Sequence, residues 1–144
     1  MDNQVEKNKA IAKVFFDELY NKGNLDAIEK FLDSNVTVQK TFPWQRKGIK
    51  AFNDTIEILK PAFPDLKIKF GEILGEGDKV ICAFTVKGTH KESFLNMPAT
   101  NRNVEYEEVN ILKFRDEKII EHHVIADTYN LMQQITGIEL NNLV

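Results

Sequence analysis

Apolar residues of the N-terminal segment recur at the spacing of a helix. Between residues 4 and 21 they fall three or four positions apart, with charged residues between them, which predicts an amphipathic helix. Gly23 follows, and glycine readily takes the left-handed conformation that ends a helix. Residues 25–32 predict a second, shorter helix with Asn24 as its N-cap. The apolar face of the first helix comprises Ile11, Phe15, Phe16, Leu19 and Tyr20.

A strand and a third helix come next. Residues 35–40, "NVTVQK", alternate apolar and polar side chains, as a half-buried strand does. After the loop "FPWQRKG", residues 49–63 return to helical spacing. We expect this helix to end near Lys60, because Pro61 disfavours helical geometry in the residue before it.

The second half of the chain has mostly the pattern of strands. Residues 65–74 alternate, and Leu66, Ile68, Phe70 and Leu74 are expected on one face. The strands that follow are predicted at residues 79–90, 104–114 and 118–127, with turns at "EGD" and "RDE" and a loop at "ESFLNMPATNRN", and a closing helix at 128–135 ends at Gly137.

Helices that precede a run of turn-linked strands indicate an α+β fold with a mostly antiparallel sheet. The N-terminal helices can cover only one face of such a sheet, so the sheet is expected to curve around them. A curved sheet capped by helices leaves a pocket between the layers. With 144 residues and no linker or repeat, the chain is expected to form a single domain over residues 1–144.

The composition is that of an ordinary globular protein, with 42% hydrophobic and 28% charged residues. The net charge of −3 and the absence of a Lys/Arg cluster make nucleic acid an unexpected partner. No apolar stretch resembles a signal peptide or a membrane span, so we expect a cytoplasmic protein with no membrane association. The single cysteine, Cys82, excludes an internal disulfide and is interpreted as a buried structural thiol.

Four segments together resemble the SnoaL-like polyketide cyclases and the related ester cyclases, within the nuclear-transport-factor-2-like superfamily. The segments are "FFDELYNKGNLDAIEKFL", "KGIKAFNDTIEILKPAFPDLKI", "EGDKVICAFTVKGTHKESFLNMPATNRNVEYEEVNILKF" and "EKIIEHHVIADTYNLMQQITG". The resemblance implies an α+β cone with a deep, mostly apolar cavity, and frequent dimerisation through the outer sheet face. It also implies ring closure by aldol condensation without a metal or cofactor, with an aspartate as general acid/base.

Two positions depart from the pattern of that family. Val124 stands where the family carries the acid/base aspartate, and Asn110 stands where the family carries a histidine that partners it. Valine cannot transfer a proton and asparagine does not titrate. The resemblance therefore implies the fold and the pocket, and the chemistry must come from other residues or be absent.

Strand alternation indicates which polar groups can share the pocket. His122 falls on the same side of its strand as Val124, and Glu108 falls on the side of Asn110 in the preceding strand. We interpret His122 as a proton-transfer group, Glu108 as its partner or the base itself, and Asn110 as a hydrogen-bond donor to an enolate oxygen. A hydrogen-bonded structural histidine and a solvent-reaching glutamate are the ordinary alternatives.

Four further residues are candidate ligand contacts. Tyr20 matches a position where some family cyclases carry a tyrosine that orients the substrate, and Thr55 matches a cavity-facing helix position. Trp44 is expected at a wall or the mouth of the pocket, and His90 at the mouth. Each also has a structural explanation: a core tyrosine, helix packing, a loop anchor and a structural histidine.

Three functional classes remain open from the sequence. The first is a cofactor-free enzyme of the cyclase or isomerase type that acts on a small carbonyl or polyketide-like compound. The second is a non-catalytic protein that binds a small apolar ligand, and the third is a structural or interaction protein that uses only the outer face of the sheet. No metal site is expected, because the adjacent histidines 122 and 123 point to opposite faces of a regular strand. The outer row Val109, Ile111, Ile119 and Ile125 predicts a homodimer.

Overall fold

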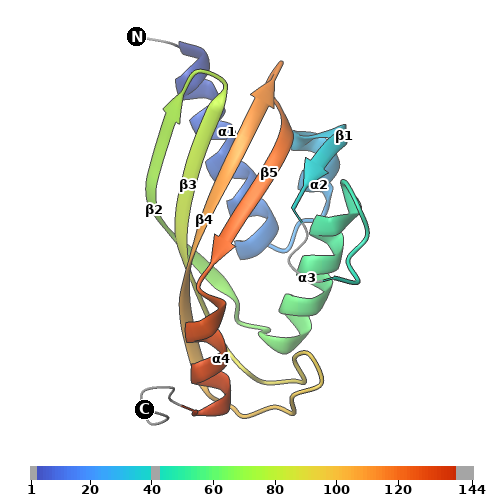
Figure 1. Cartoon of the computed structure of the whole chain (residues 1–144), viewed down its shortest axis with the longest axis vertical. Coiled ribbons are helices and arrows are strands. Elements are labelled where there is room, and N and C mark those ends of the chain that lie inside the picture. Colours follow the sequence, from blue (N-terminus) through green and yellow to red (C-terminus); the bar gives the residue numbers. More distant parts are fainter. Residues whose placement is uncertain (1–2, 40–42, 139–144) are drawn as a thin grey trace.

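The computed structural model describes residues 3–39 and 43–138 (Figure 1). Lys40, the last residue of the first predicted strand, lies outside the described residues. The elements are α1 (Asn3–Phe16), the π-helical turn η1 (Asp17–Asn21), α2 (Asp26–Phe31), β1 (Leu32–Val38), α3 (Lys50–Ala62), β2 (Lys67–Glu76), β3 (Lys79–Thr89), β4 (Asn103–Arg115), β5 (Lys118–Ala126) and α4 (Thr128–Thr136).

The strands of the described part form one sheet in the order β1-β5-β4-β3-β2. β1 runs parallel to β5, and the other neighbours are antiparallel. The antiparallel strands β2 to β5 are long and curved. α1 packs against β2 and β3, and α4 packs against β4 (Figure 1). The α+β class and the mostly antiparallel curved sheet are therefore confirmed. No described helix is long and apolar enough to cross a membrane.

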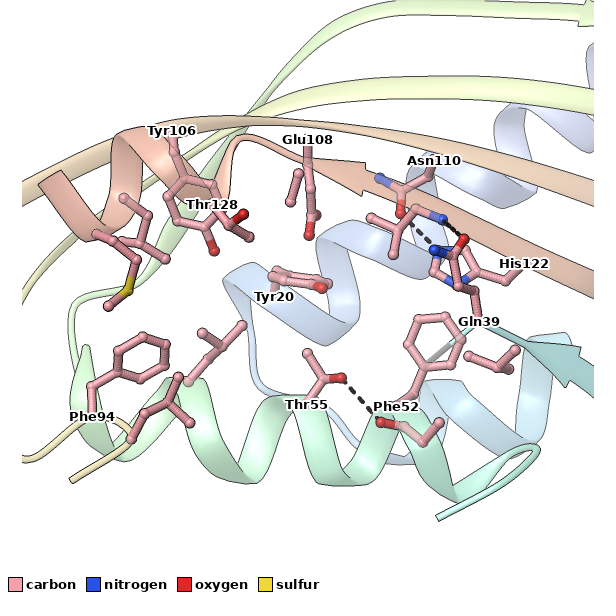
Figure 2. A pocket seen from close by; sticks show the side chains of 18 residues that line it. Tyr20, Gln39, Phe52, Thr55, Phe94, Tyr106, Glu108, Asn110, His122 and Thr128 are labelled. Carbon is pink, nitrogen blue, oxygen red and sulfur yellow. Dashed lines mark hydrogen bonds between the residues drawn. The ribbon is translucent and has the colours of Figure 1, made fainter. Parts of the chain in front are cut away.

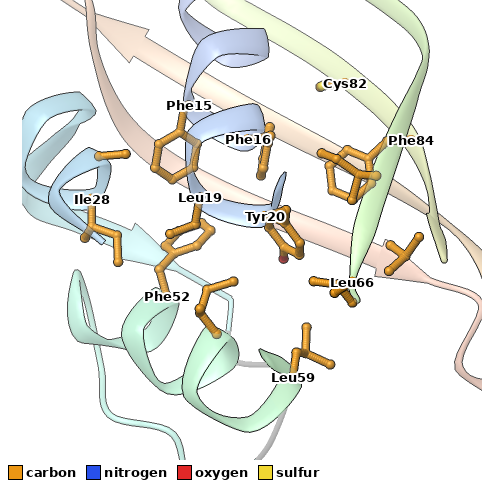
Figure 3. Close-up of a cluster of buried hydrophobic side chains, with 14 of the residues drawn as sticks. Phe15, Phe16, Leu19, Tyr20, Ile28, Phe52, Leu59, Leu66, Cys82 and Phe84 are labelled. Carbon is orange, nitrogen blue, oxygen red and sulfur yellow. The ribbon is translucent and has the colours of Figure 1, made fainter. Parts of the chain in front are cut away.

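The core lies between the N-terminal helices and the concave face of the sheet (Figure 3). Phe15 and Phe16 are fully buried, and their rings meet edge to face at 5.0 Å between centroids. Phe16 extends this contact to Phe84 on β3 at 5.1 Å, and Phe15 extends it to Phe52 on α3 at 5.3 Å. The apolar stripe read from the sequence is thus the surface that joins the helices to the sheet.

The helices depart from expectation at their ends. Gly23 has a φ of +64°, as predicted, but the N-cap position of α2 is Leu25, and the Asn24 side chain instead accepts a hydrogen bond from the Asp26 N–H at 3.1 Å. α3 passes through Pro61 and ends at Ala62, so the predicted end at Lys60 is wrong. Proline so close to a helix end removes only one late hydrogen bond, and the burial of the residues that follow compensates for it.

Two bulges change which side chains face the core. The pairing of β2 with β3 shifts between Phe70 and Ile73, which turns Leu74 outward to 54% exposure instead of the inner face that we expected. The pairing of β4 with β5 shifts near the start of β5, which places Ile119 in the core at 0% exposure. Ile119 therefore does not belong to the predicted outer row, because one extra residue in a strand reverses the alternation before it.

Candidate active site

A cavity lies between α3 and the concave side of β4 and β5, closed at one end by α4 and the β3–β4 loop (Figure 2). The space open to the centres of water molecules is about 120 Å³, roughly ten times what one water needs. The walls are mostly apolar and include Phe52, Leu59, Phe94, Leu131 and Met132. A small organic molecule fits such a space better than an ion or a polymer.

Six of the eight candidate residues line this cavity, and two do not. The six are Tyr20, Thr55, Glu108, Asn110, His122 and Val124. Trp44 is 62% exposed on its loop. His90 is fully buried beside Phe63, at 5.6 Å between ring centroids, and its Nδ1 lies 3.0 Å from Thr100 Oγ1. Neither is among the cavity-lining residues, so the expected wall and mouth positions of Trp44 and His90 are not seen in this structure.

His122 is held in one tautomer by a chain of hydrogen bonds. Its Nε2 lies 2.7 Å from Asn110 Oδ1, and the amide Nδ2 of Asn110 donates to the Cys82 carbonyl at 3.3 Å. Because the carbonyl fixes which end of the amide is the donor, Asn110 presents its oxygen to the ring and Nε2 carries the proton. Nδ1 is then an acceptor, and it has no partner among the described residues. The imidazole is therefore a fixed donor to Asn110.

Burial keeps His122 neutral. The ring is 5% exposed and packs against Phe52 at 4.7 Å and Phe16 at 6.3 Å between centroids. This desolvation lowers the pKa of His122 from an ordinary 6.5 to about 3, with a smaller contribution from His123. A histidine whose protonated form is so acidic is a weak base near neutral pH, so its surroundings suit a positioning role better than proton transfer.

Glu108 has the opposite character. It lies on β4, two residues before Asn110, and its side chain points into the cavity (Figure 2). Its Oε2 is buried with no hydrogen-bond partner in the described part of the chain. Burial raises the pKa of Glu108 from 4.5 to about 7, opposed by a weaker influence of the Asn110 amide. The carboxyl group is thus poised to take and return a proton at neutral pH.

Two tyrosines share the cavity with this carboxyl group. Tyr20 and Tyr106 are 4% and 5% exposed. Burial, and then the nearby charge of Glu108, raise the pKa of both hydroxyls well above the ordinary range, so both remain protonated donors. Tyr106 was not a candidate from the sequence, although its position two residues before Glu108 places it on the same strand face.

The other polar groups near the cavity form hydrogen bonds within the protein. The Thr55 hydroxyl donates to the Ala51 carbonyl at 3.0 Å and accepts from Gln45 Nε2 at 2.6 Å, so this hydroxyl is occupied within the protein. Val124 pairs with Asn110 across the strands, and its backbone N–H donates to Gln39 Oε1 at 3.2 Å. Within residues 3–39 and 43–138, no group of three or more His, Cys, Asp or Glu side chains is arranged to hold a metal ion.

Comparison with known protein families shows which family the chain belongs to. The sequence model for the SnoaL-like polyketide cyclases matches residues 10–135, most of the chain. The chain belongs to the SnoaL-like polyketide cyclase family. No curated protein matches this SnoaL-like chain significantly.

Solved structures agree with that assignment. A proposed SnoaL-like polyketide cyclase from Jannaschia sp. CCS1 superposes with a TM-score of 0.84 at 20% identity, covering 96% of this chain and 98% of its own. AclR, a proposed hydroxylase from Streptomyces galilaeus, gives 0.82 at 23% identity, with 94% and 99% covered. TsrD from Streptomyces laurentii gives 0.80 at 20% identity, with 96% and 99% covered.

These similarities show that the SnoaL-like chain shares their fold over nearly all of its length. At such low identity they carry no statement about its reaction, and the names of the first two proteins already differ between cyclase and hydroxylase. The chemistry of this chain has to be argued from the residues in its own cavity.

Proposed function

We propose that this SnoaL-like protein is a cofactor-free acid/base enzyme of the cyclase or isomerase type, acting on a small carbonyl or polyketide-like compound. Glu108 is the observation that carries the proposal: a carboxyl group on the cavity wall whose Oε2 atom is buried without a hydrogen-bond partner within the described residues. Leaving a carboxylate oxygen unpaired in this way is costly for folding, which favours a role for Glu108 in binding or catalysis.

In this proposal Glu108, and not His122, is the proton-transfer group. The Glu108 carboxylate removes a proton from the carbon next to the carbonyl, and the electrons of the C–H bond form an enolate. The protonated carboxyl group then returns the proton to the same or another carbon. Alternatively, the enolate carbon attacks a second carbonyl to close a ring, and the alkoxide formed there takes the proton from the carboxyl group. A pKa of about 7 supports both halves of this cycle at neutral pH.

His122 and Asn110 support the base rather than react. The Nε2–H of His122 holds the Asn110 amide, and that amide favours the charged form of Glu108. Val124, which we propose occupies the family's acid/base position, forms an apolar part of the cavity wall beside Asn110. The proton-transfer group would thereby have moved from β5 to the neighbouring strand β4.

The lining indicates the class of substrate. Among the described residues that line the cavity there is no lysine or arginine to pair with a carboxylate or phosphate on the ligand. The aromatic and aliphatic walls favour a neutral compound with one or two rings. We therefore expect a neutral ketone or ester.

A non-catalytic binding protein is the second candidate. Val124 supports it, because a cavity that carries an apolar side chain at the proposed acid/base position suits an apolar ligand. The two functions differ in one observable: only the enzyme exchanges the hydrogens next to a carbonyl with solvent.

The test is deuterium exchange into a mixed panel of neutral ketones, β-keto esters and aromatic polyketide-like methyl esters in D₂O, followed by mass spectrometry. We expect exchange with the parent protein and a loss of roughly a hundredfold or more in Glu108→Gln. Glu107→Gln is the matched control, because Glu107 is the exposed neighbour on the other face of β4. Binding of the panel without exchange would favour the second candidate.

A further inference from the structure

Two tyrosine hydroxyls on the cavity wall make no hydrogen bond to any described residue. Tyr20 and Tyr106 are both almost completely buried and line the cavity. Neither hydroxyl takes part in a hydrogen bond within the described part of the chain, and neither is among the fully buried atoms without a partner, so both reach the open space of the cavity. Two donors that face one cavity without a protein acceptor are available to a ligand.

The fold brings these donors to Glu108 from two directions. Tyr20 comes from η1, the π-helical turn that continues α1, and such turns are frequent at functional sites. Its ring lies 5.4 Å from the Phe84 ring, which fixes its orientation. Tyr106 lies two residues before Glu108 on the same face of β4. In Figure 2 the side chains of Tyr20, Tyr106 and Glu108 point into the cavity.

The three groups are close enough to interact. The negative charge of Glu108 raises the pKa of both hydroxyls, and Tyr106 also raises the pKa of Tyr20. The Tyr20 ring packs against Phe84, and both tyrosines are almost completely buried, so the donors are held in place before any ligand arrives. Donors that are already oriented stabilise a developing charge without reorganisation, which makes them effective in a water-poor cavity.

We propose that the hydroxyls of Tyr20 and Tyr106 both donate hydrogen bonds to the carbonyl oxygen of the substrate, next to the carbon that Glu108 deprotonates. The proposal rests on the proposed function in taking Glu108 as the base, and it adds Tyr106 as a catalytic residue. When the C–H bond breaks, its proton goes to the carboxylate and its electron pair forms the C=C bond of the enolate. The carbonyl π electrons move to oxygen, where the two O–H groups hold the negative charge.

This arrangement also defines the ligand that should bind most tightly. The strongest binder is a planar, mostly apolar molecule with a single oxygen that carries negative charge when Glu108 is neutral. A phenolate has this form, because its ring matches the apolar walls and its oxygen resembles that of an enolate. 4-Nitrophenol is a suitable probe, because its phenol and phenolate forms differ in colour.

The experiment titrates 4-nitrophenol into Glu108→Gln, whose neutral amide imitates the protonated carboxyl group, and records absorbance and affinity. We expect the bound probe to be ionised to a greater extent than the free probe at the same pH. Adding Tyr20→Phe or Tyr106→Phe to Glu108→Gln should each weaken phenolate binding about tenfold or more, as expected for a lost hydrogen bond to a charged oxygen. Tyr129→Phe in the same background is the matched control, because Tyr129 is half exposed on α4 and does not line the cavity.

The outcomes are distinct. The donor pair is overturned if both cavity variants bind like the Tyr129→Phe control, or if Glu108→Gln does not bind the probe at all. Phenolate binding that needs both tyrosines, in a protein that exchanges no deuterium, supports the donor pair and refutes the proposed enzyme. Exchange that needs Glu108 but is unchanged in Tyr20→Phe and Tyr106→Phe supports the enzyme and refutes the donor pair. Circular dichroism spectra confirm that each variant is folded.

Discussion

Replacing Glu108 by glutamine should stabilise the protein, and only above a defined pH. Burial raises the pKa of this carboxyl group in the folded state from 4.5 to about 7. Below pH 4.5 the carboxyl group is neutral in both the folded and the unfolded state, so folding does not have to bury a charge. As the pH rises to 7, the unfolded chain ionises first, and the folded state loses stability relative to it. The loss is complete above the folded pKa.

The size of the effect follows from the two pKa values. At about 1.4 kcal/mol for each tenfold change in proton affinity, the difference between 4.5 and about 7 corresponds to about 3 kcal/mol. Glutamine has a similar shape and never ionises. The free energy of unfolding of Glu108→Gln should therefore exceed that of the parent by about 3 kcal/mol more at pH 8 than at pH 4.

The assay is urea unfolding followed by circular dichroism at pH values between 4 and 8, with ionic strength and protein concentration held constant. His122 has the opposite dependence: its lowered pKa means that stability is present above pH 6.5 and is lost as the pH falls toward 3. This contribution is common to both proteins and cancels in the difference. A difference between Glu108→Gln and the parent that is the same at pH 4 and pH 8 would refute the reasoning.

Three further predictions concern other parts of the molecule. Asn110→Leu removes the acceptor of the buried His122 Nε2–H and should lower the free energy of unfolding by about 1–3 kcal/mol in urea titrations; an unchanged midpoint would contradict the hydrogen-bond chain. Cys82 is buried and its pKa is raised to about 12, so the folded protein should react with an aromatic disulfide reagent only at the rate of its unfolding; immediate labelling would show an open thiol. Ile125 is 69% exposed opposite Val109 on the outer sheet face, and we expect a homodimer there that Ile125→Lys dissociates in light scattering; an equal mass for both proteins would exclude this interface.

The helices and most of the strands could be predicted because their signals are local. Spacing alone identified the buried face of α1, and Gly23 and Gly137 have positive φ angles, as residues at helix ends often do. The bulges could not be predicted, because they depend on how a strand pairs with its neighbour. Leu74 and Ile119 were therefore assigned to the wrong faces, while residues beyond the bulge in β5 kept the expected alternation.

The sequence predicted which residues meet in the candidate site. It could not predict their pKa values or their hydrogen-bond roles. Alternation correctly grouped Glu108, Asn110 and His122, since each lies on a regular part of its strand. Their roles depend on burial and on the Cys82 carbonyl, which the pairing of β3 with β4 brings to Asn110. Tyr106 lies on the same face of its strand, but a tyrosine on an apolar strand face is ordinarily interpreted as a core residue. Only the structure shows that its hydroxyl makes no hydrogen bond to the described residues.

The most direct test of the account is the pH dependence of deuterium exchange into one neutral ketone that the protein turns over. We predict that kcat/KM rises with pH and levels off with an apparent pKa near 7, because the base is the ionised form of Glu108. At the plateau, Glu108→Gln should lose roughly a hundredfold or more of this rate. Full activity in Glu108→Gln, or a profile controlled by His122 instead, would contradict the assignment of Glu108 as the proton-transfer group.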